Sequence, residues 1–239
     1  MSTPEADVLP PVTPAGKMIQ TLVGIAMLSG FLVVLTYQLT KPIIAENQRR
    51  AIEAAVFKVI PDASIRKDFI VSDEGLNPVT EASPAEGILI YAGYSREGEL
   101  KGIAAKAAAQ GYADMIHILY GYDPSCECIR GMKVLKLAET PGLGDKIITD
   151  ANFVANFDAL DARLSTDGTT LANEIVTVKA GTKQNPWEID AISGATISAK
   201  AVGKAINQSA KHLLPDLLPH LEKLKQPPEL PEPHEVADD

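Results

Sequence analysis

Residues 190–202 read DAISGATISAKAV, and within them the chain changes from a turn to a helix. Gly194 favours the turn, whereas apolar and small residues recur at helical spacing over 198–214. The first turn of a helix leaves backbone N–H groups without acceptors. Thr196 or Ser198 can be a simple N-cap for them, or the N–H groups can bind an anion such as a phosphate. The stretch alone does not choose between these two interpretations.

Upstream of this helix, the chain is rich in stretches with the β-branched, partly alternating character of strands. We predict strands at residues 87–95, 100–109, 114–123, 129–138 and 174–180. One further amphipathic helix is predicted at 145–160. Several strands in succession, followed by helices, indicate an α+β fold with a mostly antiparallel sheet and flanking helices.

Composition and hydropathy divide the chain into parts. We expect a disordered Pro-rich tail at 1–16, a transmembrane helix at 17–41, a folded domain at 42–214 and a Pro- and acid-rich tail at 215–239. Either this tail is solvated throughout, or LLPDLLPHLEKL at 213–224 forms a surface helix. Residues 18–40 carry no charge, and at ~1.5 Å per residue they can cross a ~30 Å hydrocarbon core. The length of this run and the lack of an A-x-A-like site argue against a cleaved signal peptide. A helix continues the anchor and stops before Pro61.

The orientation of the anchor can be estimated from its flanking charges. Lys17 precedes the apolar run, whereas Lys41, Arg49 and Arg50 follow it. Positive residues favour the cytoplasmic side, so this count alone places the folded domain in the cytoplasm.

Charge and cysteine content exclude several classes of function. The net charge of −9 argues against nucleic acid as a partner, because phosphate backbones select for Lys and Arg. Cys126 and Cys128 are the only cysteines, and a C-x-C pair supplies half of a tetrahedral metal site. The four histidines show no spacing that completes such a site, so we expect no metal. The two cysteines are then turn residues or a local disulfide.

A second loop, AETPGLGDK at 138–146, lies between a predicted strand and helix. Pro141 fixes one dihedral angle, and Gly142 and Gly144 allow the backbone to approach a flat or anionic ligand closely. A plain strand-to-helix connection would have a similar composition. Neither GxxxxGK[ST] nor GxGxxG occurs, which excludes a nucleotide-hydrolysing P-loop.

Taken together, DxxSGAT at 190–196 and ETPGLGD at 139–145 resemble the FMN-binding domain of membrane electron-transport complexes. The resemblance is strongest to the G subunit of Rnf-type ion-translocating complexes, and extends to the related C subunit of sodium-translocating NADH:quinone reductase. QGYADMIHILYGYDP at 110–124 and the N-terminal anchor fit the same pattern. The resemblance covers the chain from the anchor to about residue 212 and identifies 42–214 as an FMN-binding domain.

The resemblance implies specific roles for the residues of the SGAT stretch. Thr196 would carry FMN through a phosphoester bond, and a separate flavin transferase would read Asp190, Ser193, Gly194 and Ala195. The phosphate would be stabilised by the N–H groups of the following helix, with Ser198 nearby. The family's domain faces away from the cytoplasm, on the periplasmic side of the inner membrane, which contradicts the count of flanking charges.

The resemblance also places the ETPGLG loop along the flavin. We expect contacts from Glu139, Thr140, Gly142, Leu143 and Gly144, with none of these residues acting as a catalytic acid or base, since the flavin carries the redox chemistry. The chain is then an electron-transfer component that works with partner membrane subunits, not an autonomous enzyme. A membrane-anchored flavin sensor is one alternative. A non-redox scaffold, in which SGAT merely caps a helix, is another.

Overall fold

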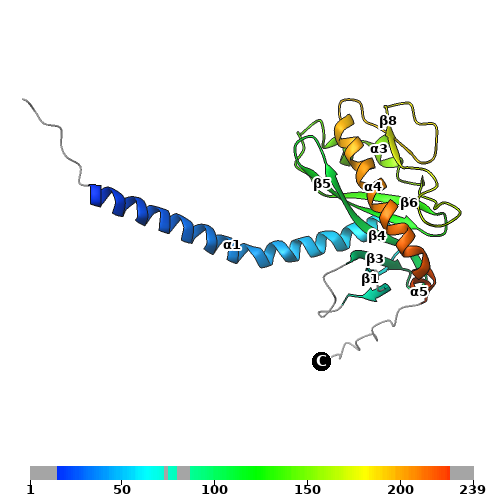
Figure 1. Ribbon diagram of the computed structural model, residues 1–239, viewed down its shortest axis with the longest axis horizontal. Coiled ribbons are helices and arrows are strands. Elements are labelled where there is room, and N and C mark those ends of the chain that lie inside the picture. The colour runs from blue at the N-terminus through cyan, green and yellow to red at the C-terminus, as the bar shows by residue number, and fades with distance from the viewer. Residues whose placement is uncertain (1–14, 73–74, 80–86, 227–239) are drawn as a thin grey trace, which may run out of the picture. The chain divides into compact units, whose positions relative to one another are not determined.

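The computed structural model describes residues 15–72, 75–79 and 87–226, and the remainder of the two expected tails lies outside them. The chain divides into two compact units, Met1–Arg50 and Ala51–Asp239, whose elements are labelled in Figure 1.

The first unit consists, over its described part, of the long helix α1 (Ala15–Val59), whose last residues belong to the second unit. The helix includes the expected transmembrane segment and begins two residues before it. Its apolar window has a mean hydropathy of 2.2, and its side chains are exposed. Among the described residues, α1 is the one helix long and apolar enough to cross a membrane. The helix continues through Pro42 and stops before Pro61, as expected.

The second unit is built on an antiparallel sheet with the strand order β2-β1-β3-β4-β5-β6-β7. Its strands are β1 (Ile65–Ser72), β2 (Gly75–Pro78), β3 (Ile88–Tyr94), β4 (Leu100–Gln110), β5 (Met115–Asp123), β6 (Cys128–Lys136) and β7 (Leu160–Asp161). A second, parallel pair consists of β8 (Val176–Val178) and β9 (Glu188–Asp190). The structure confirms the α+β fold and the four strands predicted between 87 and 138. The strand predicted at 174–180 is present as the shorter β8.

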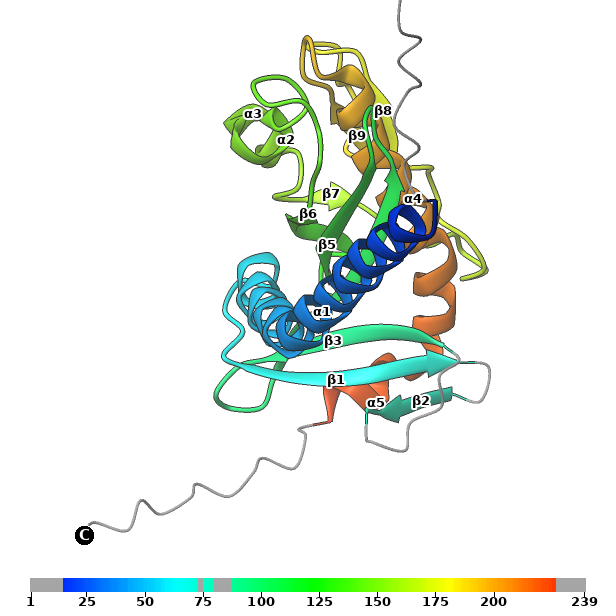
Figure 2. The ribbon, with the colours of Figure 1, turned by 90° about the vertical axis from the view of Figure 1, so that its left-hand side faces the viewer.

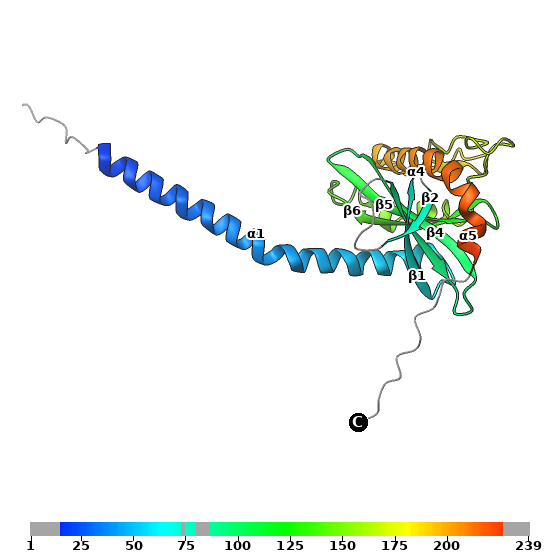
Figure 3. The same ribbon diagram turned by 60° about the horizontal axis from the view of Figure 1, so that its bottom comes forward.

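Alternation along the central strands gives the sheet two buried faces, because successive side chains point to opposite sides. In β4, Ile103 and Ala105 belong to the main core, whereas Ala104 belongs to a smaller core on the other face. The main core is covered by the helix α4 (Thr196–Leu217), which lies across the sheet in Figure 3. The smaller core receives the end of α1, including Val56 and Val59.

Glycines in the sheet make room for the end of α1. Gly121 and Gly131 are paired on β5 and β6, and a Cβ atom at Gly131 would lie 2.7 Å from the Cα of Val59. A Cβ atom at Gly121 would collide with the Val59 carbonyl. The backbone of α1 therefore rests directly on the sheet at these two glycines.

The sequence misplaced several local elements. Strands β1 and β2 were not predicted, because β1 carries the charged run Arg66, Lys67 and Asp68, which hides its alternation. The structure stabilises this run by a 2.7 Å ion pair between Arg66 and Asp68. The single helix expected at 145–160 is wrong.

In place of that helix, the chain forms α2 (Lys146–Thr149), α3 (Ala151–Ala155) and the strand β7. Asp150 interrupts the helix with an extended ψ of 111°, and its side chain accepts a 3.0 Å hydrogen bond from the Phe153 N–H. Asp150 is therefore the N-cap of a new helix and not an interior residue.

The region after 214 is more ordered than its composition indicated. Helix α4 continues through Pro215, and a 3₁₀ turn (Leu218–His220) and α5 (Leu221–Lys225) follow it. Leu217 and Leu224 are buried, and Lys223 donates a 2.8 Å hydrogen bond to the carbonyl of Leu76 in β2, close to α5 in Figure 2. Residues 215–226 thus belong to the folded unit, because their leucines complete its core.

We expect Gly121→Ala to destabilise the second unit. In an open strand position this change is neutral or favourable, but here the added methyl group meets the α1 backbone, and overpacking of this kind costs about 1–3 kcal/mol. Thermal unfolding of the detergent-solubilised chain, followed by circular dichroism, should show a fall in Tm of roughly 2–10 °C. The control is Gly30→Ala, where nothing lies within 4 Å of the added carbon and the Tm should not fall. Equal Tm values for Gly121→Ala and the unsubstituted chain would contradict the close packing.

Candidate cofactor-binding site

A pocket of about 510 Å³ lies where three segments of the second unit meet. These segments are the β4–β5 turn (residues 111–114), the loop 139–144 after β6, and the start of α4. The pocket is lined by Tyr112, Glu139, Thr140, Leu143, Gly144, Gly194, Ala195, Thr196, Ile197 and Ser198. The two sequence motifs, which are far apart along the chain, therefore form one site.

The start of α4 differs from an ordinary capped helix. Its N-cap is Ala195, and no side chain caps it. Thr196 is the first helical residue and is exposed, and its hydroxyl has only a 3.5 Å contact with the Ile192 carbonyl. Gly194 has a φ of +84°, which a residue with a side chain would adopt only with strain. The turn thus presents the Thr196 hydroxyl without using it as a cap.

The first turn of α4 also presents backbone donors. Within the described part of the chain, the N–H groups of Thr196, Ile197 and Ser198 have no hydrogen-bond acceptor, whereas the N–H of Ala199 already bonds to the Ala195 carbonyl. None of the described residues that line the pocket is Lys, Arg or His. An anion bound here would therefore be held by backbone N–H groups and the helix dipole.

Glu139 is buried beneath this turn, with 8% of its surface exposed. One carboxylate oxygen accepts a 3.0 Å hydrogen bond from the Ala113 N–H, and the other accepts a 2.5 Å bond from the Ser198 hydroxyl. Burial by itself raises the pKa of the Glu139 carboxyl. The Ser198 hydroxyl and the backbone N–H groups of the β4–β5 turn outweigh burial, so the pKa lies below its ordinary value. The carboxyl is therefore ionised at neutral pH.

The same contact defines what Ser198 can offer to a ligand. Its hydroxyl proton is donated to Glu139, so this proton is not available to a phosphate. Its backbone N–H remains available. Ser198 can therefore bind a phosphate through its backbone N–H group and not through its hydroxyl.

Three of the sequence-predicted site residues lie outside the pocket lining: Ser193, Gly142 and Asp190. The Asp190 carboxylate accepts hydrogen bonds of 2.8 and 3.0 Å from the Gly181 N–H, and one of 3.3 Å from Thr182. Its backbone N–H donates to the buried side chain of Asn156 at 2.9 Å. Asp190 therefore shapes the turn after β8 in the folded chain.

Two pocket residues were missed by the sequence reasoning. Tyr112 and Ile197 line the pocket with 69% and 54% of their surfaces exposed. Tyr112 belongs to the Gly-Tyr pair within the stretch 110–124, so a signal for it was present. Ile197 shares a helix face with Lys200 and Lys204, and an apolar residue at helical spacing from two lysines was the signal in the sequence.

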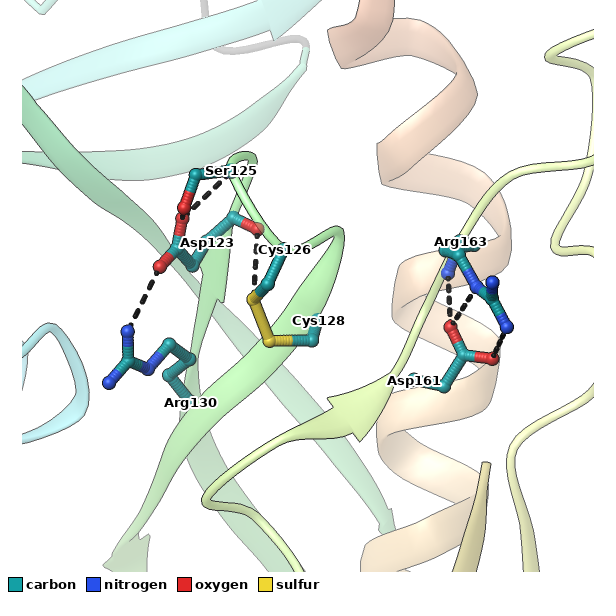
Figure 4. Close-up of a disulfide and its surroundings, with 7 residues drawn as sticks. All are labelled: Asp123, Ser125, Cys126, Cys128, Arg130, Asp161 and Arg163. Carbon is teal, nitrogen blue, oxygen red and sulfur yellow. Dashed lines mark hydrogen bonds and ion pairs between the residues drawn. A yellow bond between two sulfur atoms is a disulfide. The ribbon is translucent and has the colours of Figure 1, made fainter. Parts of the chain in front are cut away.

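The two cysteines lie at the end of the β5–β6 hairpin, outside the pocket. Cys126 and Cys128 form a disulfide, which resolves the two alternatives left by the sequence (Figure 4). Cys126 is exposed, and Cys128 is buried. Within the described residues, no group of His, Cys, Asp or Glu is arranged to hold a metal ion.

The pocket suits a flavin nucleotide in two respects. Leu143, Ile197 and the ring of Tyr112 offer apolar surface to a flat ring system. The unpartnered N–H groups at the start of α4 offer donors to a phosphate, beside the accessible Thr196 hydroxyl. The residues present therefore fit FMN.

The fold is shared with proteins of solved structure. NqrC of Shewanella oneidensis aligns with a TM-score of 0.53 at 17% identity, covering 76% of this chain and 97% of that one. The C subunit of the Na(+)-translocating NADH-quinone reductase of Parabacteroides distasonis aligns with a TM-score of 0.52 at 18% identity, covering 75% and 94%. At these identities the likeness establishes the fold alone.

Closer relatives establish the family. Residues 111–211 match the model of the FMN-binding domain, and residues 20–59 match the RnfG N-terminal region. The G subunit of the ion-translocating oxidoreductase complex of Methanosarcina acetivorans is 30% identical, over 82% of this chain and 93% of its own. The G subunit of the Na(+)-translocating ferredoxin:NAD(+) oxidoreductase complex of Acetobacterium woodii is 34% identical, over 66% and 67%. The chain therefore belongs to the family formed by the G subunits of ion-translocating oxidoreductase complexes.

Proposed function

We propose that the chain is a membrane-anchored electron-transfer subunit that carries FMN, joined to the Thr196 hydroxyl oxygen by a phosphoester bond. The observation that carries the proposal is the exposed hydroxyl of the first residue of α4, beside unpartnered N–H groups at the mouth of an apolar pocket. A hydroxyl kept only for capping would accept a hydrogen bond from an N–H group of the helix, whereas this one makes only the 3.5 Å contact with the Ile192 carbonyl.

The roles of the pocket residues follow from their positions. The N–H groups of Thr196, Ile197 and Ser198 would hold the phosphate, and Leu143, Ile197 and Tyr112 would cover the ring. Bound FMN supplies the uptake and release of electrons. The protein orients it and, through the covalent bond, prevents its loss. Thr140 and Gly144 complete the wall on the side of the loop.

The proposed setting is a membrane complex. Relatives are named as subunits of ion-translocating oxidoreductase complexes, and α1 supplies one apolar span among the described residues. A path for ions needs several elements arranged around it, which one helix cannot supply. Electron input and ion movement would therefore depend on partner membrane subunits.

We further propose that the folded domain lies on the extracytoplasmic side, which is the periplasm in cells with an outer membrane. Disulfides persist in oxidising compartments and are rare in the cytosol, and the Cys126–Cys128 bond is reachable from solvent at Cys126. Large domains can be translocated regardless of flanking charge, so the Lys and Arg count need not decide the matter. The family resemblance points to the same side.

A flavin transferase is the proposed agent of attachment. In the reaction, the donor is a flavin whose phosphate is linked to a second phosphate group. The Thr196 oxygen forms a bond to the flavin phosphorus, the bond from that phosphorus to the bridging oxygen breaks, and the second phosphate group leaves with the Thr196 proton. Asp190, Ser193, Gly194 and Ala195 are the proposed recognition residues. The carboxylate of Asp190 is bonded to Gly181 and Thr182 in the folded chain, so it would have to be released before a transferase could bind it.

We expect Thr196→Ala to abolish covalent flavin. The chain, co-expressed with a flavin transferase, should show a fluorescent band on a denaturing gel, and its intact mass should exceed that of the polypeptide by one FMN phosphoester. Thr196→Ala should show neither signal. Thr140→Ala is the matched control, because it changes the other threonine in the pocket and should keep the band. A band that persists in Thr196→Ala would place the attachment elsewhere.

Leu143→Ala should shift the midpoint potential of the attached flavin without detaching it. Leu143 is half exposed at the pocket mouth, and its removal admits water beside the ring. A shift of up to roughly 60 mV for one electron corresponds to a tenfold change in equilibrium. Potentiometric titration measures it, with Ile148→Ala, an exposed position outside the lining, as the control. Equal midpoint potentials in the Leu143→Ala and Ile148→Ala variants would show that Leu143 does not contact the flavin.

The orientation is tested by thiol labelling in intact cells, with the outer membrane removed where one is present. A membrane-impermeant reductant followed by an impermeant maleimide should label Cys126 and Cys128 before lysis. The double variant Cys126→Ser, Cys128→Ser is the control and should not be labelled. Labelling that appears only after lysis would place the domain in the cytoplasm.

A further inference from the structure

Glu139 contacts both of the other segments that form the pocket. It follows β6, it accepts a hydrogen bond from the β4–β5 turn at Ala113, and it accepts another from α4 at Ser198. We propose that Glu139 is a positioning residue, whose carboxylate clamps the first turn of α4 against the β4–β5 turn and thereby fixes the direction in which Thr196 presents its flavin. The second half of this proposal rests on the proposed function.

The surroundings of Glu139 are shaped to its carboxylate. A Cβ atom at Gly144 would lie 2.6 Å from one carboxylate oxygen and 2.8 Å from the Ser198 hydroxyl oxygen. A Cβ atom at Gly111 would collide with the other carboxylate oxygen. Two glycines in the two loops thus leave only the space that the clamp occupies. Such close enclosure holds the carboxylate in one geometry.

Hydrogen bonds, not an ion pair, stabilise this buried carboxylate. Among the described residues, no Lys, Arg or His lies within ion-pair distance of Glu139. Burying a charge is costly unless its hydrogen bonds are made. Removing the carboxylate would leave the Ala113 N–H and the Ser198 hydroxyl without partners, at the place where the two segments meet.

The clamp acts on the flavin through the helix. Ser198 lies two residues after Thr196, in the same turn of α4. A shift of Ser198 would therefore move both the Thr196 side chain and the N–H groups expected to hold the phosphate. This differs from the direct contact between Glu139 and the flavin that the family resemblance implied, since both carboxylate oxygens already have partners within the protein.

Two substitutions separate the hydrogen bonds from the charge. Glu139→Ala removes both. Glu139→Gln keeps the geometry, because its amide oxygen can accept from Ala113 and its amide nitrogen can donate to the Ser198 oxygen. The matched control is Glu174→Ala. It removes a carboxylate that pairs at 3.3 Å with Lys211, a residue of α4 that lies far from the first turn of that helix.

The first measurement is hydrogen exchange on the full chain in detergent, expressed without a flavin transferase. Glu139→Ala should raise the exchange rates of the amides at 113 and 199 by about tenfold or more, as the loss of buried hydrogen bonds implies. Glu139→Gln and Glu174→Ala should leave them within about threefold of the original rates. Unchanged exchange in Glu139→Ala, or equal acceleration in Glu139→Gln, would overturn the clamp.

The second measurement is fluorescence anisotropy decay of the flavin-loaded chain. Glu139→Ala should keep its covalent flavin on the gel but add a fast local motion, and Glu139→Gln should restore the slow decay. Faster exchange without added flavin motion would make Glu139 purely structural and refute the positioning role. If the unsubstituted chain carried no flavin, the proposed function would fail, and the exchange rates would still decide whether the clamp exists.

Discussion

The position of α4 on the sheet is the constraint that fixes the site. The inner face of α4 is a row of small and branched side chains, including Ala199, Val202 and Ile206, packed against the core face of β4 and β5. The side chains of Ala105 and Ala107 on β4 are small, so the helix can approach the sheet closely at these positions. Because the helix is buried along its length, its first turn is held at one place on the sheet. Everything proposed for Thr196 follows from that placement.

Tight packing also holds the last turns of α1 within the second unit. The last turns of α1 are buried against the sheet face opposite α4, at glycines that admit no side chain. Residues 51–59 are therefore part of the domain and not a free tether. The two faces of the sheet thus pack against two different helices, α4 on one face and the end of α1 on the other.

The site combines an open helix start with a closed interior. At the surface, the Thr196 hydroxyl makes only its 3.5 Å contact with the Ile192 carbonyl, and the backbone donors are left without partners. Beneath them, the carboxylate of Glu139 has its hydrogen bonds satisfied and is enclosed by glycines. In the proposed clamp, this enclosed carboxylate holds the first turn of α4, and with it the exposed donors, in place. The absence of cationic side chains among the described lining residues leaves charge stabilisation to the main chain.

Local patterns in the chain were enough to predict the apolar span, the α+β class, four central strands and the two motifs that form the pocket. The span, the fold class and the strands follow from periodicity and from residue types, which need no knowledge of distant contacts. The two motifs were joined in one flavin site only through the family resemblance. Packing in three dimensions was needed to show that Asp150 breaks a helix, that 215–226 complete the core, and that Tyr112 joins the pocket. It was also needed to show that Glu139 bonds to Ser198 and not to solvent. Partners 59 positions apart along the chain meet only once the sheet and α4 have packed, and no local pattern records that meeting.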